Sequence, residues 1–120
     1  MKFERLTLKE IQVRPVVVKL KRPVVARIAT MDEWPLILID IYTNEGIVGR
    51  SYLEPYVIKS MRYLVPALHD LGTMLVGSSL SPIDLFERAR KSLHFVGYEG
   101  LSMIAVSGLD MAIWDALAKA

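Results

Sequence analysis

The chain of 120 residues contains no cysteine, only two histidines and no long uncharged apolar run. The lack of cysteine excludes disulfide bonds and thiolate chemistry within this sequence, and it makes a reducing, cytoplasmic location the expectation. The first ten residues contain neither a continuous apolar segment nor a small-residue cleavage site, so they do not predict a signal peptide. The stretch nearest to a membrane span, residues 101–118, includes two aspartates, and we expect no membrane segment.

An excess of charge of one sign is also lacking. The 15 Lys and Arg residues are balanced by 13 Asp and Glu residues, which gives a formal net charge of +2. The only short basic cluster is Lys19, Lys21 and Arg22, and a basic surface this thin does not predict a nucleic-acid partner. The hydrophobic fraction of 52% is slightly above the usual range, which suggests apolar surface for the rest of a longer polypeptide or for another subunit.

No catalytic or metal-binding constellation is complete in this sequence. His69 and His94 fit no ligand spacing and have no cysteine partner, so we expect both to be structural. The serines form no nucleophile elbow, and the glycines form no phosphate-binding loop. Asp110 and Asp115 would lie roughly 140° apart around a helix, so each is expected to meet an Arg, a Lys or a backbone N–H instead of forming a carboxylate pair. We assign no catalytic residue and no metal ligand to this chain.

The first half of the chain predicts strands. Residues 3–20 alternate imperfectly between apolar and charged side chains, which indicates one or two strands with a break at Pro15. Residues 36–42 and 47–53 are runs of strand length, joined by a compact turn in which Gly46 can supply a positive φ. These two runs predict a β-hairpin.

The second half predicts helices. From Val57 and Ile58 onwards the apolar residues follow a helical period, and Pro66 inside this stripe predicts a kink or a second start. A Ser-Pro pair at residues 81–82 predicts another helix start. Residues 100–120 are small or apolar on nearly all sides, which is typical of a helix inside a large core. Strands followed by helices predict an α+β fold with segregated layers.

Residues 21–35 lie between the predicted strands, are bracketed by prolines and follow neither period. Their apolar side chains are Val24, Val25, Ile28, Met31 and Trp34. Two interpretations stay open from the residues alone. The segment is either a mobile loop that closes over a ligand or a loop that packs statically on its own sheet.

Three segments together resemble the N-terminal capping domain of the enolase superfamily, in the group of mandelate racemase and muconate lactonizing enzymes. They are P-L-I-L-I-D-I-Y-T-N-E-G-I-V-G at residues 35–49, G-Y-E-G-L at residues 97–101 and A-V-S-G-L-D-M-A-I-W-D-A-L-A-K at residues 105–119. The third is similar to the signature helix of that group. The likeness extends over essentially the whole chain, residues 1–120, and within the group it is closest to mandelate racemase.

The resemblance implies a fold and an activity. The fold would be a three-stranded antiparallel meander followed by a helical bundle, whose last helix runs toward a (β/α)8 barrel. The activity would be proton abstraction α to a carboxylate, by a racemase, an epimerase or an acid-sugar dehydratase, with Mg²⁺ held by barrel residues outside this chain. The partners would be a small hydroxy-acid or sugar-acid substrate, the barrel domain and further subunits of a homo-oligomer.

The resemblance also implies substrate-facing residues on this chain. Val24, Ile28 and Met31 would lie over the barrel mouth, where closure expels water. Glu54 and Tyr56 would lie beside the distal group of the substrate. Mandelate racemase has an aromatic residue at the position of Glu54. A carboxylate is poorly solvated against a phenyl ring, so we expect a more polar substrate such as a sugar acid, unless Glu54 turns outward to solvent.

A function of a different class stays open. The chain could be a self-sufficient, non-catalytic α+β module that oligomerises through its last helix. Such a module would be monodisperse and would unfold cooperatively on its own. A capping domain separated from its barrel would instead leave residues 101–120 poorly protected or prone to aggregation.

Overall fold

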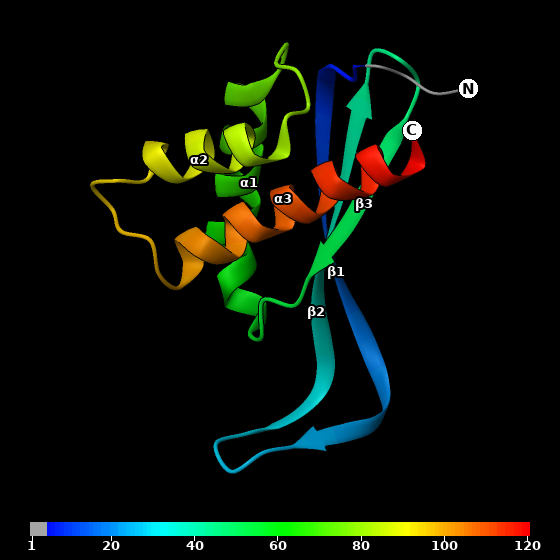
Figure 1. Ribbon diagram of the computed structural model, residues 1–120. Helices are drawn as coiled ribbons and strands as arrows, with labels where there is room; N and C mark the ends of the chain where they lie inside the picture. Colours follow the sequence, from blue (N-terminus) through cyan, green and yellow to red (C-terminus); the bar gives the residue numbers. More distant parts are fainter. Residues whose placement is uncertain (1–4) are drawn as a thin grey trace.

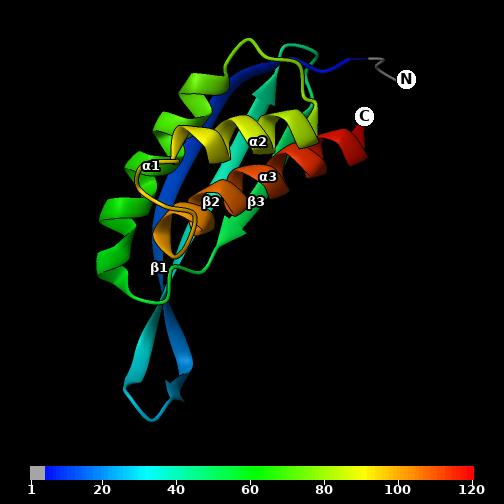
Figure 2. The same ribbon diagram turned by 60° about the vertical axis from the view of Figure 1, so that its left-hand side comes forward.

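The structure is a computed structural model that describes residues 5–120. Three antiparallel strands form one sheet in the order β1-β2-β3, and three α-helices and a short 3₁₀ helix follow them. The elements are β1 (Leu8–Val25), β2 (Thr30–Thr43), β3 (Val48–Leu53), η1 (Ile58–Ser60), α1 (Met61–Leu75), α2 (Pro82–Ser92) and α3 (Leu101–Lys119). The helices cover one face of the sheet (Figures 1 and 2). The predicted α+β fold, a three-stranded meander with a helical layer, is confirmed.

Strand β2 is the middle strand and alternates between the two faces of the sheet. Ile37, Ile39 and Ile41 are fully buried in the core beneath the helices. Asp40 takes the opposite face, where its carboxylate contacts Arg14 at 2.5 Å and Arg50 at 3.3 Å. The apolar run that predicted a strand therefore supplies the core on one side and the centre of an ion-pair network on the other.

The predicted hairpin of β2 and β3 is confirmed. The main-chain N–H of Thr43 donates a hydrogen bond of 3.0 Å to the carbonyl of Ile47, and Gly46 has a φ of 87°. The side chain of Thr43 also bonds both the carbonyl and the N–H of Ile47, at 2.8 and 2.9 Å. These bonds fix the turn and therefore the register of β3.

Helix α3 lies unusually close to the sheet because glycine stands at two crossing points. A Cβ added at Gly49 of β3 would overlap the carbonyl oxygen of Ala112 and would lie 2.8 Å from the Cβ of Ala116. A Cβ added at Gly108 of α3 would lie 2.7 Å from both Ile39 and Leu53 side chains. The small residues of the last segment thus allow the backbones of helix and sheet to meet.

Burial in this domain accounts for part of the apolar character of α3, since Leu101, Met111 and Trp114 remain exposed. By length and composition the helix could cross a membrane, with a mean hydropathy of 1.4. Its packing is nevertheless that of a core helix, because it contacts β2, β3, α1 and α2. Its buried residues are Ala105, Val106, Gly108, Leu109, Ala112, Ile113 and Ala116.

The expected break at Pro15 is wrong, and so is the second helix start, one of the two alternatives at Pro66. Pro15 does not break the first strand, since β1 runs through it and Pro15 pairs with Ile37. An edge strand tolerates proline because one side of its backbone needs no hydrogen-bond partner, and β1 is an edge strand. Pro66 starts no new helix and lies inside α1. Buried Leu64 and Leu68 pack on the core on both sides of Pro66, which holds the helix together despite one missing backbone bond.

Candidate functional site

The segment expected to be a loop, residues 21–35, is a β-ribbon. Strands β1 and β2 continue their pairing through Val24 opposite Met31 and Val25 opposite Thr30. The expectation failed because β1 contains a large bulge: it advances five residues from Lys19 to Val24 (24 − 19) while β2 advances two from Glu33 to Met31 (33 − 31). The three extra residues bend the ribbon, which projects away from the helix-covered body (Figure 1).

The tip of the ribbon is a two-residue turn with an exposed apolar side chain. The N–H of Ala26 donates to the carbonyl of Ala29 at 2.8 Å, and the N–H of Ala29 donates back at 3.3 Å. Ile28, within the turn, is 95% exposed. Val25 and Val24 beside it are also exposed. The tip therefore gathers three exposed apolar side chains, which are available for contact with another surface.

Residues 54–58, which follow β3, contain a strained turn. Tyr56 has a φ of 65° and is the only non-glycine residue with a positive φ within residues 5–120. The N–H of Val57 donates a hydrogen bond of 2.7 Å to the carbonyl of Pro55, which closes a three-residue γ-turn around Tyr56. The positive-φ form of this turn is rare and unfavourable for a residue with a side chain. The side chain of Tyr56 is 65% exposed.

A cleft of about 600 Å³ lies between the ribbon and this turn. Its walls are mainly apolar and include three charged residues. The lining residues are Ile28, Met31, Trp34, Pro35, Tyr56, Val57, Ile58, Ala26, Ala29, Lys19, Asp32 and Glu33. An apolar cleft with sparse polar groups is typical of sites that take small molecules.

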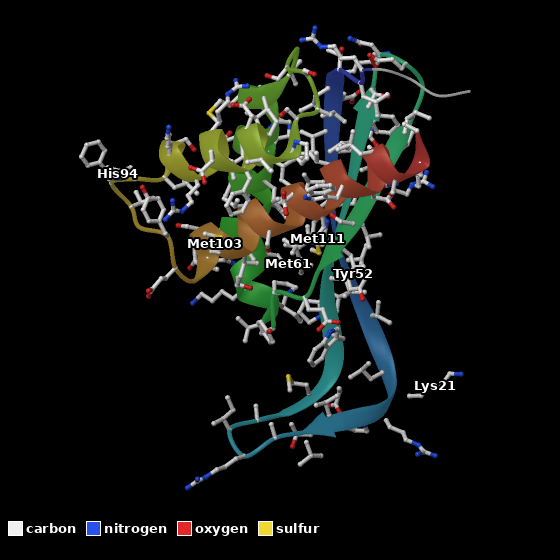
Figure 3. The ribbon with its side chains drawn as sticks, viewed as in Figure 1. Lys21, Tyr52, Met61, His94, Met103 and Met111 are labelled. Carbon is white, nitrogen blue, oxygen red and sulfur yellow. The ribbon has the colours of Figure 1, made fainter. Side chains whose placement is uncertain are left out.

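A second cleft, about 780 Å³ in volume and open to solvent, lies between β3 and α3. Glu54 lines it together with Tyr56, and Met111 and Trp114 of α3 form part of the opposite wall. Figure 3 labels Tyr52 of β3 and Met111 of α3, which both border this cleft. Tyr56 borders both clefts, so it stands at their junction.

The structure brings four of the five candidate residues to this junction. Ile28, Met31 and Tyr56 line the cleft below the ribbon, and Glu54 and Tyr56 line the cleft along α3. Val24 lies on the ribbon but lines neither cleft. Whether these residues contact a substrate stays a prediction.

Sequence reasoning placed Val57 and Ile58 wrongly. They were expected to begin the buried stripe of a helix. Ile58 does begin the 3₁₀ helix η1, which runs directly into α1, but both side chains are exposed and line the cleft below the ribbon. The γ-turn at Tyr56 reverses the chain before the helix begins. The signal that could have located it was Pro55, because proline directly after a strand favours a turn.

Asp115 lines the second cleft and joins α3 to β3. Its carboxylate accepts hydrogen bonds from Lys119, at 2.7 Å, and from the main-chain N–H of Arg50, also at 2.7 Å. The bond from Lys119, with that from Arg50, lowers the pKa of Asp115 below its ordinary value of 3.8. The expected partners, a Lys and a backbone N–H, are confirmed. For Asp110, burial raises the pKa, opposed by a hydrogen bond with Trp114.

The histidines lie outside this site. His94 hydrogen-bonds the hydroxyl of Tyr98 at 2.6 Å, on the loop after α2 and away from the ribbon (Figure 3). Among residues 5–120 no group of three His, Cys, Asp or Glu side chains is placed to hold a metal ion. These residues therefore do not fit a magnesium site. The two clefts instead present apolar side chains from the ribbon, the carboxylate of Glu54 and the phenol of Tyr56.

Comparisons with known proteins agree with this architecture. The family model of the mandelate racemase / muconate lactonizing enzyme N-terminal domain matches residues 8–120. An enolase from an alphaproteobacterium (BAL199), solved with bound magnesium, is 65% identical, with a TM-score of 0.91 over 95% of this chain and 31% of that one. An enolase from Bradyrhizobium, complexed with magnesium and mandelic acid, is 36% identical, with a TM-score of 0.90 over 98% of this chain and 33% of that one.

A curated relative also matches most of this chain. The D-galactonate dehydratase of Klebsiella pneumoniae is 32% identical over 98 residues, which are 78% of this chain and 25% of the relative. The chain thus spans about a quarter of that relative's length and about a third of the two solved structures. Because the family model covers residues 8–120, we conclude that this chain belongs to the mandelate racemase / muconate lactonizing enzyme family, of which it carries the N-terminal domain.

Proposed function

We propose that this chain is the substrate-recognition and lid domain of a Mg²⁺-dependent racemase, epimerase or acid-sugar dehydratase. The reaction would begin with removal of the proton α to a substrate carboxylate. The observation that carries the proposal is the junction of the two clefts at Tyr56, below a projecting apolar ribbon. Family membership and the names of the relatives support the reaction class.

The catalytic groups and the metal ligands are proposed to lie in a barrel domain of the full-length protein. Bound Mg²⁺ would neutralise negative charge that develops on the substrate carboxylate. The residues of this chain have other tasks. Ile28 and Met31 would cover the substrate and exclude water, which strengthens electrostatic interactions inside the closed site. Tyr56 would offer its hydroxyl as donor or acceptor at the substrate's distal end.

We propose a polar distal group on the substrate because Glu54 lines the cleft beside Tyr56. An ionised carboxylate accepts hydrogen bonds from hydroxyl groups, which a sugar acid supplies and a phenyl ring does not. The dehydratase relative favours this choice. A second candidate, an aryl 2-hydroxy acid, is favoured by the relative that binds mandelic acid.

The barrel domain is the proposed partner of the exposed apolar side chains on α3. Met111 is 44% exposed and Trp114 is 51% exposed, and Tyr52 borders the same cleft at 58%. Burial of aromatic and methionine side chains is a common source of interface energy. We also propose that the full-length protein is cytoplasmic and homo-oligomeric. If instead residues 1–120 expressed alone are monodisperse and unfold cooperatively, the stand-alone module becomes the better description.

The experiment uses the full-length protein with Mg²⁺ in D₂O and two substrate sets, C5–C6 sugar acids and aryl 2-hydroxy acids. Proton NMR follows loss of the α-hydrogen signal, which reports racemisation or epimerisation, and formation of a 2-keto-3-deoxy acid, which reports dehydration. We expect one of these changes with at least one sugar acid. Turnover of aryl acids alone would favour the second candidate. No α-hydrogen exchange and no product with either set would contradict the proposed reaction class.

A further inference from the structure

Ser60 holds the strained turn at Tyr56 from outside the clefts. The side chain of Ser60 lies 2.7 Å from the carbonyl oxygen of Pro55 and 2.7 Å from the carbonyl oxygen of Val57. These two carbonyls belong to the residues on either side of Tyr56. The main-chain N–H of Ser60 also donates to the carbonyl of Val57, at 3.0 Å. Ser60 is 7% exposed, so water does not compete freely for these bonds.

Ser60 lies where the short helix η1 runs directly into α1. Its bond to the Val57 carbonyl is the i−3 back-bond that Ser92 and Ser107 also make, whereas a capping serine accepts a hydrogen bond from a free helix N–H. The hydroxyl of Ser60 makes no such bond. It is directed back to the turn and donates its one proton between two carbonyl acceptors. The bond to the carbonyl of Pro55, five residues back, reaches beyond the helix and holds the strained turn.

The turn needs stabilising hydrogen bonds because the backbone conformation of Tyr56, with its positive φ, is unfavourable. A tyrosine in the left-handed region persists only where its surroundings hold it there, and such residues gather at functional sites. Removal of the Ser60 hydroxyl would leave the Pro55 carbonyl with the strained bond from Val57 as its remaining contact at this turn. The turn could then open, and the phenol of Tyr56 would leave the junction of the clefts.

We propose that Ser60 is a positioning residue that acts on the substrate through Tyr56. The inference rests on the proposed function, since it requires that Tyr56 contacts the substrate. Ser60 lines neither cleft, so any effect it has on turnover is transmitted through the turn. In this proposal Tyr56 would touch the ligand, and Ser60 would hold Tyr56 in place without touching the ligand itself.

The test is a double-mutant cycle in the full-length protein, with the substrate that the NMR experiment identifies. Ser60→Ala, Tyr56→Ala and the double variant are compared by kcat and KM. We expect Ser60→Ala to lower kcat/KM about tenfold when Tyr56 is present and less than about twofold when it is alanine, because coupled residues are not additive. Ser92→Ala is the matched control: Ser92 also donates to a backbone carbonyl, that of Ala89 at 2.7 Å, but on α2.

The outcomes separate the two claims. If Ser60→Ala lowers kcat/KM by the same factor in both backgrounds, or not at all, the positioning role is contradicted while the lid function stands. If Tyr56→Ala leaves kcat/KM unchanged, the substrate contact itself is wrong, and the inference fails with it.

A second measurement needs no substrate. Chymotrypsin cleaves after tyrosine, and we expect Ser60→Ala to increase cleavage after Tyr56 at least about threefold, because cleavage of a native protein tracks the population of locally opened backbone. Cleavage after Tyr63, exposed but inside α1, serves as the internal reference. Equal acceleration at both tyrosines would indicate general destabilisation and would overturn the local role of Ser60.

Discussion

The main-chain N–H of Arg50 donates a hydrogen bond of 2.7 Å to the carboxylate of Asp115, joining β3 to the C-terminal half of α3. Two neighbouring hydrogen bonds also join β3 to α3. Lys119 bonds the carbonyl of Val48 at 2.9 Å, and the hydroxyl of Ser51 donates to the carbonyl of Gly108 at 2.6 Å. Strand β3 is therefore bonded to α3 along its length, and its end sets where Glu54 and Tyr56 stand.

Replacing Asp115 with alanine is expected to weaken the attachment of β3 to α3 by about 1 kcal/mol of local opening free energy, because a hydrogen bond to a charged group is lost at a partly exposed site. The measurement is hydrogen exchange of the Arg50 amide in the full-length protein, which should become about fivefold faster. Asp84→Ala is the matched control, since the Asp84–Arg88 pair is exposed and 3.8 Å long. Unchanged exchange at Arg50 in the Asp115 variant would show that the bond contributes nothing to β3.

The same carboxylate predicts a pH dependence. The pKa of Asp115 is lowered in the folded state, chiefly by Lys119, so its stabilisation is fully present above the unfolded value of 3.8 and is lost as the pH falls through the folded value. The difference in stability between the wild type and Asp115→Asn should therefore hold at pH values above 3.8 and shrink as the pH falls below that value. A difference that grows on acidification has the wrong sign for this account.

Gly49→Ala tests the close approach of α3 to the sheet. The added methyl would meet the backbone of Ala112, which cannot turn aside as a side chain can. We expect a destabilisation of about 2–3 kcal/mol, typical of overpacking, measured as a loss of thermal stability of the full-length protein. At Gly97, where φ is 100° and nothing lies within 4 Å, alanine should cost only the backbone term, about 1 kcal/mol. Similar losses at both positions would argue against a special contact at Gly49.

Ile28→Ser tests the ribbon tip as a cover. The side chain is 95% exposed, so the change should leave thermal stability within about 0.5 kcal/mol. In the full-length enzyme it should raise KM or lower kcat/KM several-fold, because an apolar contact that excludes water is lost. Phe95→Ser, a change at an equally exposed apolar residue on the loop after α2, is the control and should alter neither constant. If KM and kcat/KM were the same in both variants, Ile28 would have no role in covering the substrate.

The sequence predicted the parts of this fold that depend on short-range patterns. The β2–β3 hairpin follows from two strand-like runs around Gly46, and α3 follows from small and apolar residues at helical spacing. Both patterns report on neighbours within a few residues. The motifs at residues 35–49 and 105–119 also carried the family resemblance, which the match over residues 8–120 confirms.

The candidate site was predicted less completely because it depends on longer-range or unusual geometry. The ribbon requires pairing across a bulge of three extra residues, and Pro23 within that bulge argues locally against a strand. The turn at Tyr56 requires a backbone conformation that usually signals its place by glycine or asparagine. Without that signal, Val57 and Ile58 were assigned to a helix core, although they line the cleft.

The central claim is that residues at the junction of the two clefts choose the substrate, and Glu54 tests it most directly. The ratio of kcat/KM for a sugar acid to kcat/KM for an aryl 2-hydroxy acid is measured for the full-length enzyme and for Glu54→Phe. The account predicts that the ratio falls at least about tenfold in the variant, since a hydrogen-bonding carboxylate is replaced by an apolar ring. An unchanged ratio would contradict the claim, because it would mean that Glu54 faces solvent and takes no part in recognition.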